Sequence, residues 1–454
     1  MTAFAAAPQL VRPADSAGAG AERFGREVER LRQLHASLWR KTDDSPPVLG
    51  EPVGKRRQRD NARAAERLLE DIARRCEEYP DSEEERRSWR AEVREMVRRF
   101  GEDRLGWPEG YRSLLFAEAF HDTTVRFVRE ARVFDPVVKI EDVGQALRNV
   151  WIMNSLQLLF DRDVRFSPAI FGYSMLYPCT DNFLDDTTVS PGAKVAFNRD
   201  LGLRLCGAPV LPRTRHEQQA FALVDRIETQ YSRRRDPDVF RSLLAIHRAQ
   251  QRSLAQHGGG GGRDEETLLQ ISVAKGGASL LADGYLVAGE LSPEAAELCF
   301  GYGVFLQLLD DLQDCRADAD AGHATLFTRA AARGTLDRLT GRLHRFMRRV
   351  LDDSSRLRAP EYDDRKDLIL RNCTFLLVGA VAEQQELFSQ PFRRSLEERW
   401  PLDFASISRL RRRATRRYRK VARVLSRRNA VDSPFDLLQG ATSGAEQDVL
   451  ARLV

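Results

Sequence analysis

The sequence predicts an all-α protein, and three observations agree on this fold class. Apolar residues recur every three or four positions over long stretches such as 140–160 and 367–388, which is the spacing of one helix face. We find no convincing run of alternating polar and apolar residues that would predict a β-strand, and no clear internal repeat. Of the 454 residues, 42% are hydrophobic and 31% are charged, a balance typical of a globular protein.

The N-terminal part of the chain is expected to lie apart from the main helical domain. Residues 1–60 are interpreted as mostly disordered or linker, with one possible helix at 22–40. Residues 61–109 are interpreted as a charged helical extension with solvated outer faces. Because proline interrupts helices, this extension is expected to be a hairpin that breaks at Tyr79-Pro80-Asp81.

One helical domain is predicted from 110 to 430, followed by a C-terminal tail at 431–454. Pro178 lies inside the third expected helix and should kink it. His257 and the five glycines after it predict a flexible loop, since a phosphate-binding P-loop would need a Lys and a Ser or Thr after a strand. The expected helices cover, in chain order, 111–133, 140–160, 167–186, one or two helices within 217–256, 268–291, 293–314, 335–351, 367–388 and 406–428.

The charge and the cysteines argue against several classes of function. The 72 basic and 67 acidic residues leave a net charge of only +5, so no nucleic-acid partner is expected. The six cysteines show neither a CxxC pair nor zinc-finger spacing, and we interpret them as free thiols of a cytoplasmic protein. The start of the chain lacks a signal-peptide pattern, and no stretch approaches the roughly 18 apolar residues of a membrane span.

Two aspartate-rich patches stand in apolar, helix-patterned sequence. The first runs from Asp181 to Asp186 and the second from Asp310 to Asp314. In each patch two aspartates lie four residues apart, so on a helix both carboxylates would point the same way. Burying several carboxylates among Leu and Phe is costly unless cations neutralise them. Two such helices facing each other would suit Mg²⁺, a hard cation that prefers oxygen ligands and often bridges substrate phosphates.

The chemistry that such a site favours is the ionisation of a diphosphate ester. Metal ions held between carboxylates and diphosphate oxygens act as Lewis acids and neutralise the charge of the leaving group. The carbocation that remains needs a dry, apolar and partly aromatic pocket, where ring faces stabilise positive charge.

The stretch from about 170 to 330 resembles the class I isoprenoid synthases, and especially the trans-polyprenyl diphosphate synthases. This resemblance implies the isoprenoid synthase helical bundle, here with an N-terminal helical extension, a prenyl diphosphate substrate, and a homodimer as the common assembly. Four segments in the expected order carry it: Asp181–Asp186, Ala274–Leu280, Gln307–Asp314 and Gly322–Phe327.

The resemblance also implies which side chains would bind Mg²⁺, with more than one ion expected. Asp181, Asp185 and Asp310 would be the direct ligands. Three further aspartates would either ligate or orient ligands and waters: Asp186, Asp311 and Asp314.

For the substrate, the resemblance implies that Lys275 would hold the diphosphate as a point charge. Gln307 would hydrogen-bond near the reaction centre. His323 stands where the family has a second diphosphate-binding lysine, and a histidine is less reliably charged. Three residues before the first patch are candidates for the pocket wall and floor, although ordinary core packing explains them equally well: Tyr173, Leu176 and Tyr177.

Departures from the family pattern bear on the reaction. Asn182 replaces the second aspartate of the family's first motif, in a form that resembles the head-to-head coupling enzymes that make squalene. Elongating enzymes bind isopentenyl diphosphate with an adjacent arginine pair after the first motif, and here only Arg199 and Arg204 follow. The basic run Lys55–Arg59 lies too far upstream to replace the family's other acceptor segment. The acceptor site is therefore incomplete.

An enzyme with the ionising groups but without the acceptor site would cyclise, deprotonate or hydrate the cation, which is terpene synthase chemistry. We favour this function, although the Asn-Ser-Glu motif of typical terpene cyclases is absent. Chain elongation, head-to-head coupling and a catalytically inactive helical partner subunit are the alternatives.

The Arg-rich segment 406–428 predicts a basic amphipathic helix. Such a helix could make a peripheral contact with an anionic membrane, or it could bind RNA. A solvated surface helix is the simpler interpretation, and we favour it.

Overall fold

Helix is the only regular secondary structure in the part of the chain that the structure describes, so the predicted all-α class is confirmed. None of the helices in this part is long and apolar enough to span a bilayer. The expected glycine loop after His257 and the tail at 431–454 lie outside it. The computed structural model describes residues 15–80, 82–108, 118–253, 264–353 and 362–427.

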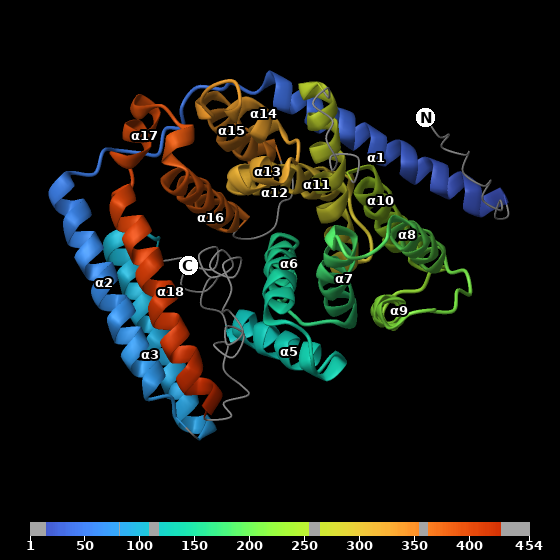
Figure 1. The fold of residues 1–454 in the computed structure, drawn as a ribbon, viewed down its shortest axis with the longest axis horizontal. Helices are drawn as coiled ribbons and strands as arrows, with labels where there is room; N and C mark the ends of the chain where they lie inside the picture. The colour runs from blue at the N-terminus through green and yellow to red at the C-terminus, as the bar shows by residue number, and fades with distance from the viewer. Residues whose placement is uncertain (1–14, 81, 109–117, 254–263, 354–361, 428–454) are drawn as a thin grey trace.

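Most long helices lie close to the predicted ranges, and the stretch 217–256 contains two of them (Figure 1). Four helices, α8, α13, α14 and α17, lie outside the predicted ranges because they are short or do not segregate apolar residues to one face. The α-helices are α1 (Asp15–Lys41), α2 (Lys55–Glu77), α3 (Glu83–Phe100), α5 (Glu118–Phe134), α6 (Ile140–Leu159), α7 (Pro168–Asp185), α8 (Pro191–Leu205), α9 (Arg215–Glu228), α10 (Pro237–Ser253), α11 (Glu265–Ala288), α12 (Pro293–Gln313), α13 (Cys315–Ala321), α14 (Leu326–Ala331), α15 (Asp337–Asp353), α16 (Tyr362–Glu383), α17 (Gln390–Glu397) and α18 (Phe404–Arg427), with a π-helical turn η1 (Gly101–Leu105) and a 3-10 turn η4 (Gln385–Leu387).

Polar caps determine where the helices around the candidate site begin. Ser167 precedes α7, Asp264 precedes α11 and Ser292 precedes α12, and each side chain accepts a hydrogen bond from the backbone N–H three residues later. Such caps satisfy N–H groups that have no partner inside the helix. Pro178 lies inside α7, which continues through it to Asp185.

The pair α11 and α12 forms the centre of the bundle. The two helices approach so closely at Gly276 and Gly303 that neither position has room for a side chain. A Cβ atom on Gly276 would lie 2.5 Å from the Cβ of Gln307 and closer still to the carbonyl oxygen of Gly303. This close approach fixes the position of Lys275 on α11 relative to the second aspartate patch on α12.

The N-terminal helix belongs to the main core, which corrects the interpretation of residues 1–60 as mostly linker. α1 packs against α10, α11, α12 and α15, and it buries Leu31, Ala36 and Trp39 within the same core cluster as those helices. An apolar stripe of this kind on a helix needs a partner surface. The bundle supplies that surface, so α1 completes it.

The predicted extension and the Arg-rich helix pack together into a three-helix arm, made of α2, α3 and α18 (Figure 1). α2 begins at Lys55, inside the segment interpreted as linker, because its start is anchored: Gln58 Nε2 donates to the carbonyl oxygens of Glu397 and Trp400 at 2.6 and 2.9 Å. The predicted break holds, since α2 ends at Glu77 and α3 starts at Glu83. The boundary between residues 61–109 and 110–430 therefore does not separate two packing units.

α18 is not solvated on all sides. It packs on α2, and Arg413 pairs with Glu66 at 3.1 Å and with Glu70 at 3.6 Å. Its exposed face still carries arginines such as Arg412 and Arg416, so peripheral contact of this face with a membrane stays a prediction.

Candidate active site

The two predicted aspartate patches lie at the C-terminal ends of α7 and α12, and the fold brings them into electrostatic range of each other. Burial raises the pKa of Asp181 to about 6; the charge of Lys275 on α11 opposes this shift, and the charges of Asp185 and Asp310 add to it. Helix α7 and the consecutive pair α11 and α12 thus contribute to one group, which we call the Asp–Lys cluster: Asp181, Asp185, Asp310 and Lys275.

Asp181 is held in place by two hydrogen-bond donors. Nε2 of Gln250 on α10 donates to Asp181 Oδ1, and the hydroxyl of Tyr177, one turn earlier on α7, donates to the same carboxylate. The charge of Asp181 raises the pKa of Tyr177 well above its ordinary value, which keeps this hydroxyl protonated. The carboxylate at the centre of the cluster therefore has a fixed orientation.

Two half-buried cations lie at this site: Lys275 is near the carboxylates, and Arg148 is near Tyr177. Lys275 lies within electrostatic range of Asp181. Arg148 on α6 lies near Tyr177, and its charge opposes the rise in the pKa of that hydroxyl. Among the described residues neither cation has an ion-pair partner within 4.0 Å. A partly buried cation without a partner is costly, so the two cations suit a bound anion.

The two adjacent aspartates of the second patch have different surroundings. Asp310 faces the cluster, whereas the neighbouring Asp311 is buried between α11 and α12. Asp311 accepts hydrogen bonds from Ser272 Oγ and Gln307 Nε2, both at 2.9 Å, and burial raises its pKa to about 7. Gln307 therefore donates its hydrogen bond to Asp311, and this pair lies at the contact between α11 and α12. Asp314 is the C-cap residue of α12.

His323 contacts Asp318, an aspartate close to the cluster that sequence reasoning missed. Its Nδ1 lies 3.5 Å from Asp318 Oδ1 on α13. Burial raises the pKa of Asp318; the charges of His323 and Lys275 oppose this shift, and that of Asp310 adds to it. The segment after Gly322 begins α14, where Thr325 forms a capping box with Thr328. This turn places His323 beside the cluster.

Asp186 and Asn182 lie at the edge of the site. Asp186 Oδ1 accepts hydrogen bonds from the N–H and hydroxyl of Thr188, at 2.8 and 2.7 Å, and these bonds lower its pKa. It is exposed and closes the turn after α7, apart from the other carboxylates. Asn182 Nδ2 donates to Asp142 Oδ1 at 2.7 Å and so ties α7 to α6. The departure from the family motif at this position thus has a local structural role.

The three predicted pocket residues lie below the cluster on α7. Tyr173 and Leu176 are buried and Tyr177 is half-buried. Tyr173 lies one turn beyond Tyr177 on the same face, where it hydrogen-bonds with Ser279 of α11, and burial raises its pKa well above the ordinary value. Two tyrosines, one turn apart on α7, therefore lie between the cluster and the core.

The donor set suits ions shared with a substrate better than an ion enclosed by protein. Among the described residues, no three His, Cys, Asp or Glu side chains gather closely enough to hold a metal ion alone. Mg²⁺ usually takes one or two carboxylates and completes its shell with waters and substrate phosphates. Asp181 has Asp185 and Asp310 within electrostatic range, so the cluster offers carboxylates for ions shared in this way, with the charge of Lys275 nearby.

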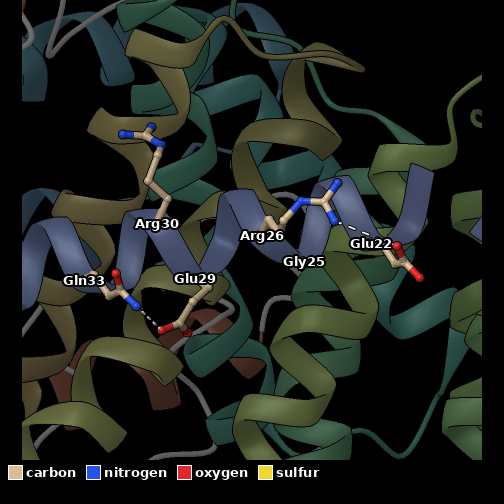
Figure 2. A pocket seen from close by; sticks show the side chains of 6 residues that line it. All are labelled: Glu22, Gly25, Arg26, Glu29, Arg30 and Gln33. Atoms are coloured by element: carbon tan, nitrogen blue, oxygen red, sulfur yellow. Dashed lines mark hydrogen bonds and ion pairs between the residues drawn. The ribbon is translucent and has the colours of Figure 1, made fainter. Parts of the chain in front are cut away.

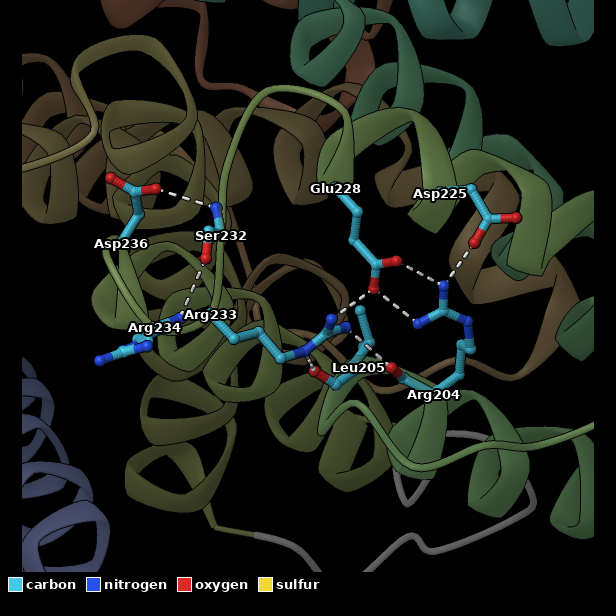
Figure 3. A network of polar contacts seen from close by, with 8 residues as sticks. All are labelled: Arg204, Leu205, Asp225, Glu228, Ser232, Arg233, Arg234 and Asp236. Carbon is cyan, nitrogen blue, oxygen red and sulfur yellow. Dashed lines mark hydrogen bonds and ion pairs between the residues drawn. The ribbon is translucent and has the colours of Figure 1, made fainter.

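The arginines considered for a second diphosphate are used elsewhere. Figure 3 shows Arg204 of α8 bound to Asp225 and Glu228 of α9, and Arg233 bound to Glu228 as well. The distance from Arg204 Nη1 to Glu228 Oε1 is 2.6 Å. The Arg204 side chain is only 15% exposed. Arg199 pairs with Asp200 at 2.8 Å. The contacts of Arg204 tie α8 to α9, and that of Arg199 stays within α8, so both guanidinium groups already have carboxylate partners.

Two surface depressions lie away from the cluster. Figure 2 shows one of about 490 Å³ along a single face of α1, lined by charged side chains such as Glu22 and Arg26. The other, of about 590 Å³, lies between α1, α11, α14 and α15, where Arg40 pairs with Glu266 and Arg333 with Glu265. Their polar groups already bind one another, so neither is a candidate site.

Sequence reasoning missed four side chains around the site: Arg148, Gln250, Asp283 and Asp318. Of these only Asp283 had a signal in the sequence, a single acid in the apolar stretch after Lys275. We found no match to this chain among protein-family models, curated proteins or solved structures. The assignment of the site therefore depends on the residues of this chain alone.

Proposed function

We propose that this chain is a Mg²⁺-dependent class I isoprenoid synthase that ionises an allylic prenyl diphosphate. The observation that carries the proposal is the meeting of Asp181 and Asp310, from α7 and α12, within electrostatic range of Lys275 and next to Tyr177, which lies close to Arg148. Among the described residues neither cation has an ion-pair partner within 4.0 Å. Burial and the charges of Asp185 and Asp310 raise the pKa of Asp181, so a bound cation would stabilise its charged form. Lys275 and Arg148 would in turn bind the oxygens of an anion. A magnesium diphosphate supplies both.

The roles of the side chains follow from this arrangement. Asp181, Asp185 and Asp310 would hold Mg²⁺, which when bound supplies Lewis-acid neutralisation of the departing diphosphate. Lys275 and Arg148 would bind diphosphate oxygens as fixed charges. Tyr177 orients Asp181 through its hydrogen bond.

Among the possible reactions we favour that of a terpene synthase. Arg204 and Arg199 are engaged in ion pairs away from the cluster, and Lys55 of α2 pairs with Glu397 of α17 at 3.6 Å. This supports an enzyme without a site for isopentenyl diphosphate. Chain elongation and head-to-head coupling are the alternatives that the first experiment separates.

The experiment is an incubation of purified protein with Mg²⁺ and prenyl diphosphates of increasing length, each with and without isopentenyl diphosphate, read by mass spectrometry. We expect a hydrocarbon or alcohol to form without isopentenyl diphosphate. A longer diphosphate formed only with it would instead show chain elongation, and a doubled carbon number would show head-to-head coupling. Absence of turnover with every substrate would favour the inactive partner subunit.

Variants connect the reaction to the cluster. We expect Asp181→Asn and Asp310→Asn each to abolish release of diphosphate while circular dichroism shows unchanged helix content. Asp320→Asn, an exposed aspartate on α13, is the matched control and should keep full activity. Turnover that persists in both cluster variants would overturn the assignment of these carboxylates.

A further inference from the structure

Asp283 is a carboxyl buried in the middle of the bundle, deeper than the Asp–Lys cluster. On α11 the residues Lys275, Ser279 and Asp283 follow one another at intervals of four, so they share one helix face. The eight residues from Lys275 to Asp283 correspond to about 12 Å along the helix axis. The facing side of α7 carries Tyr173, which hydrogen-bonds with Ser279 and feels the charge of Asp283.

The two helices therefore run in opposite directions past each other. Asp181 on α7 lies at the level of Lys275, and Tyr173, two turns earlier, lies at the level of Ser279 and Asp283. A prenyl chain anchored by its diphosphate at Lys275 and directed inward would pass the two tyrosine rings of α7, which would have to turn aside. Asp283 lies two turns beyond Lys275 on α11, at the level of Tyr173.

The contacts of Asp283 leave one of its oxygens without a partner. The side chain is 0% exposed. Asn149 Nδ2 of α6 donates a hydrogen bond to Oδ1 at 3.1 Å, and the same amide group donates to Ser174 Oγ at 3.2 Å. Oδ2 is buried and has no hydrogen-bond partner among the described residues. A buried polar atom without a partner is costly and calls for an explanation.

The charge state of Asp283 follows from these surroundings. The titratable groups that face it are Tyr173 of α7 and Cys299 of α12, and burial keeps both of them protonated; α6 contributes the uncharged Asn149. Burial raises the pKa of Asp283 to about 8. Because Oδ1 accepts from Asn149, the proton of the neutral acid resides on Oδ2, the oxygen that lacks an acceptor.

We propose that Asp283 is the proton donor and acceptor for the hydrocarbon part of the bound substrate, an inference that rests on the proposed function. Ionisation leaves an allylic cation, and the departing diphosphate takes a proton from a carbon beside it, which gives a neutral polyene. The Oδ2–H bond of Asp283 then breaks and its proton goes to one carbon of a double bond of this polyene. The π electrons form the new C–H bond, positive charge appears on the adjacent carbon, and Asp283 becomes a carboxylate. In the last step the carboxylate removes a proton from a carbon beside the final cation, whose C–H electrons form a new double bond. The neutral acid is restored.

The test is incorporation of solvent deuterium. Enzyme equilibrated in D₂O is given a prenyl diphosphate and Mg²⁺, and both free diphosphate and the mass of the product are measured. In wild-type protein the carboxyl carries deuterium, so the product should retain it on carbon. In Asp283→Asn, which has the same shape but no acid proton, we expect incorporation to fall at least tenfold and the product profile to change, while diphosphate is still released.

A neighbouring variant controls for disturbance of the core. Cys299→Ser alters a buried side chain beside Asp283 without removing an acid, and it should keep deuterium incorporation. Wild-type protein supplies a second measurement if Asp283→Asn does not fold. Its deuterium incorporation should decline as the pD rises through the pKa of Asp283, because the carboxylate has no deuteron to give.

The outcomes separate the two hypotheses. Diphosphate release without deuterium in the wild-type product, or with equal deuterium in the Asp283→Asn product, would overturn the role of Asp283 and leave the proposed function intact. No diphosphate release by the wild-type protein with any substrate would overturn the proposed function itself.

Discussion

Asp181 and Asp283 differ in what surrounds them, although burial raises the pKa of both carboxyls. Asp181 has Lys275, two other aspartates and two hydrogen-bond donors around it, so a bound cation or anion would change its charge readily. Asp283 has one amide donor and apolar or neutral neighbours. The first environment suits ligand binding, and the second suits the holding of a proton.

The pH dependence of the free energy of unfolding should reveal that Asp283 is protonated in the folded protein. Its pKa is about 8 in the folded protein and roughly 4 in an unfolded chain. The folded state therefore keeps a proton that the unfolded state loses above pH 4. The stabilisation linked to this proton is fully present below about pH 4 and is lost as the pH rises to about 8, by about 1.4 kcal/mol per pH unit.

The substitution Asp283→Asn should remove this loss of stability at rising pH. Urea unfolding of both proteins at pH 5, 6 and 7 should show a difference in unfolding free energy that shifts in favour of the variant by about 1.4 kcal/mol for each unit. A difference that does not change with pH would show that Asp283 is ionised in the folded protein, contrary to its surroundings.

At the scale of elements, the contact between α11 and α12 governs the geometry of the site. Lys275 adjoins Gly276, and Asp310 lies two turns after Gly303, so the distance between these two glycines sets the distance between the lysine and the second aspartate patch. Small residues at a helix contact allow this approach because a Cβ atom on either one would meet the backbone of the other.

A methyl group at this contact should destabilise the protein. We expect Gly303→Ala to lower the free energy of unfolding by about 1–3 kcal/mol, since well-packed backbone must move to accept the added carbon. The matched control is Gly379→Ala in α16, where a Cβ atom would meet nothing within 4 Å. This control should stabilise the protein by up to about 1 kcal/mol, because alanine favours the helix. Equal effects of the two substitutions in thermal unfolding would contradict the tight contact.

The whole molecule couples its stability to the site because the cluster draws on separate parts of the chain. α7, α11 and α12 contribute the aspartates and the lysine, α6 contributes Arg148 and α10 contributes Gln250. A ligand that joins these helices binds the folded protein and not the unfolded chain, so it must raise stability. The three-helix arm lies apart from these helices in Figure 1 and holds none of these residues.

Magnesium and inorganic diphosphate together should therefore raise the melting temperature. At one hundred times the dissociation constant the gain is about 2.7 kcal/mol. Neither ligand alone should have the full effect, because each neutralises only one sign of charge in the cluster. Asp310→Asn should lose the shift and Asp320→Asn should keep it, as followed by thermal denaturation. An unchanged shift in Asp310→Asn would place the binding site elsewhere.

The sequence by itself determined the fold class, most of the long helices and the residues at the centre of the candidate site. Helical periodicity and capping are local properties, so stretches such as 140–160 and 293–314 correspond closely to α6 and α12. The placement of two aspartates four residues apart on one helix face is equally local, and it drew attention to Asp181 and Asp310 before any contact was known.

The tertiary structure decided what lies opposite each helix face. It brought Asp318 and Gln250 to the cluster, placed α1 in the core, paired α18 with α2 and enclosed Asp283 beside Asn149. These contacts join residues that are distant in the chain, and a single sequence holds no periodic signal for them. An apolar stripe shows that a helix will bury one face, but only the packing of all helices shows against which partner.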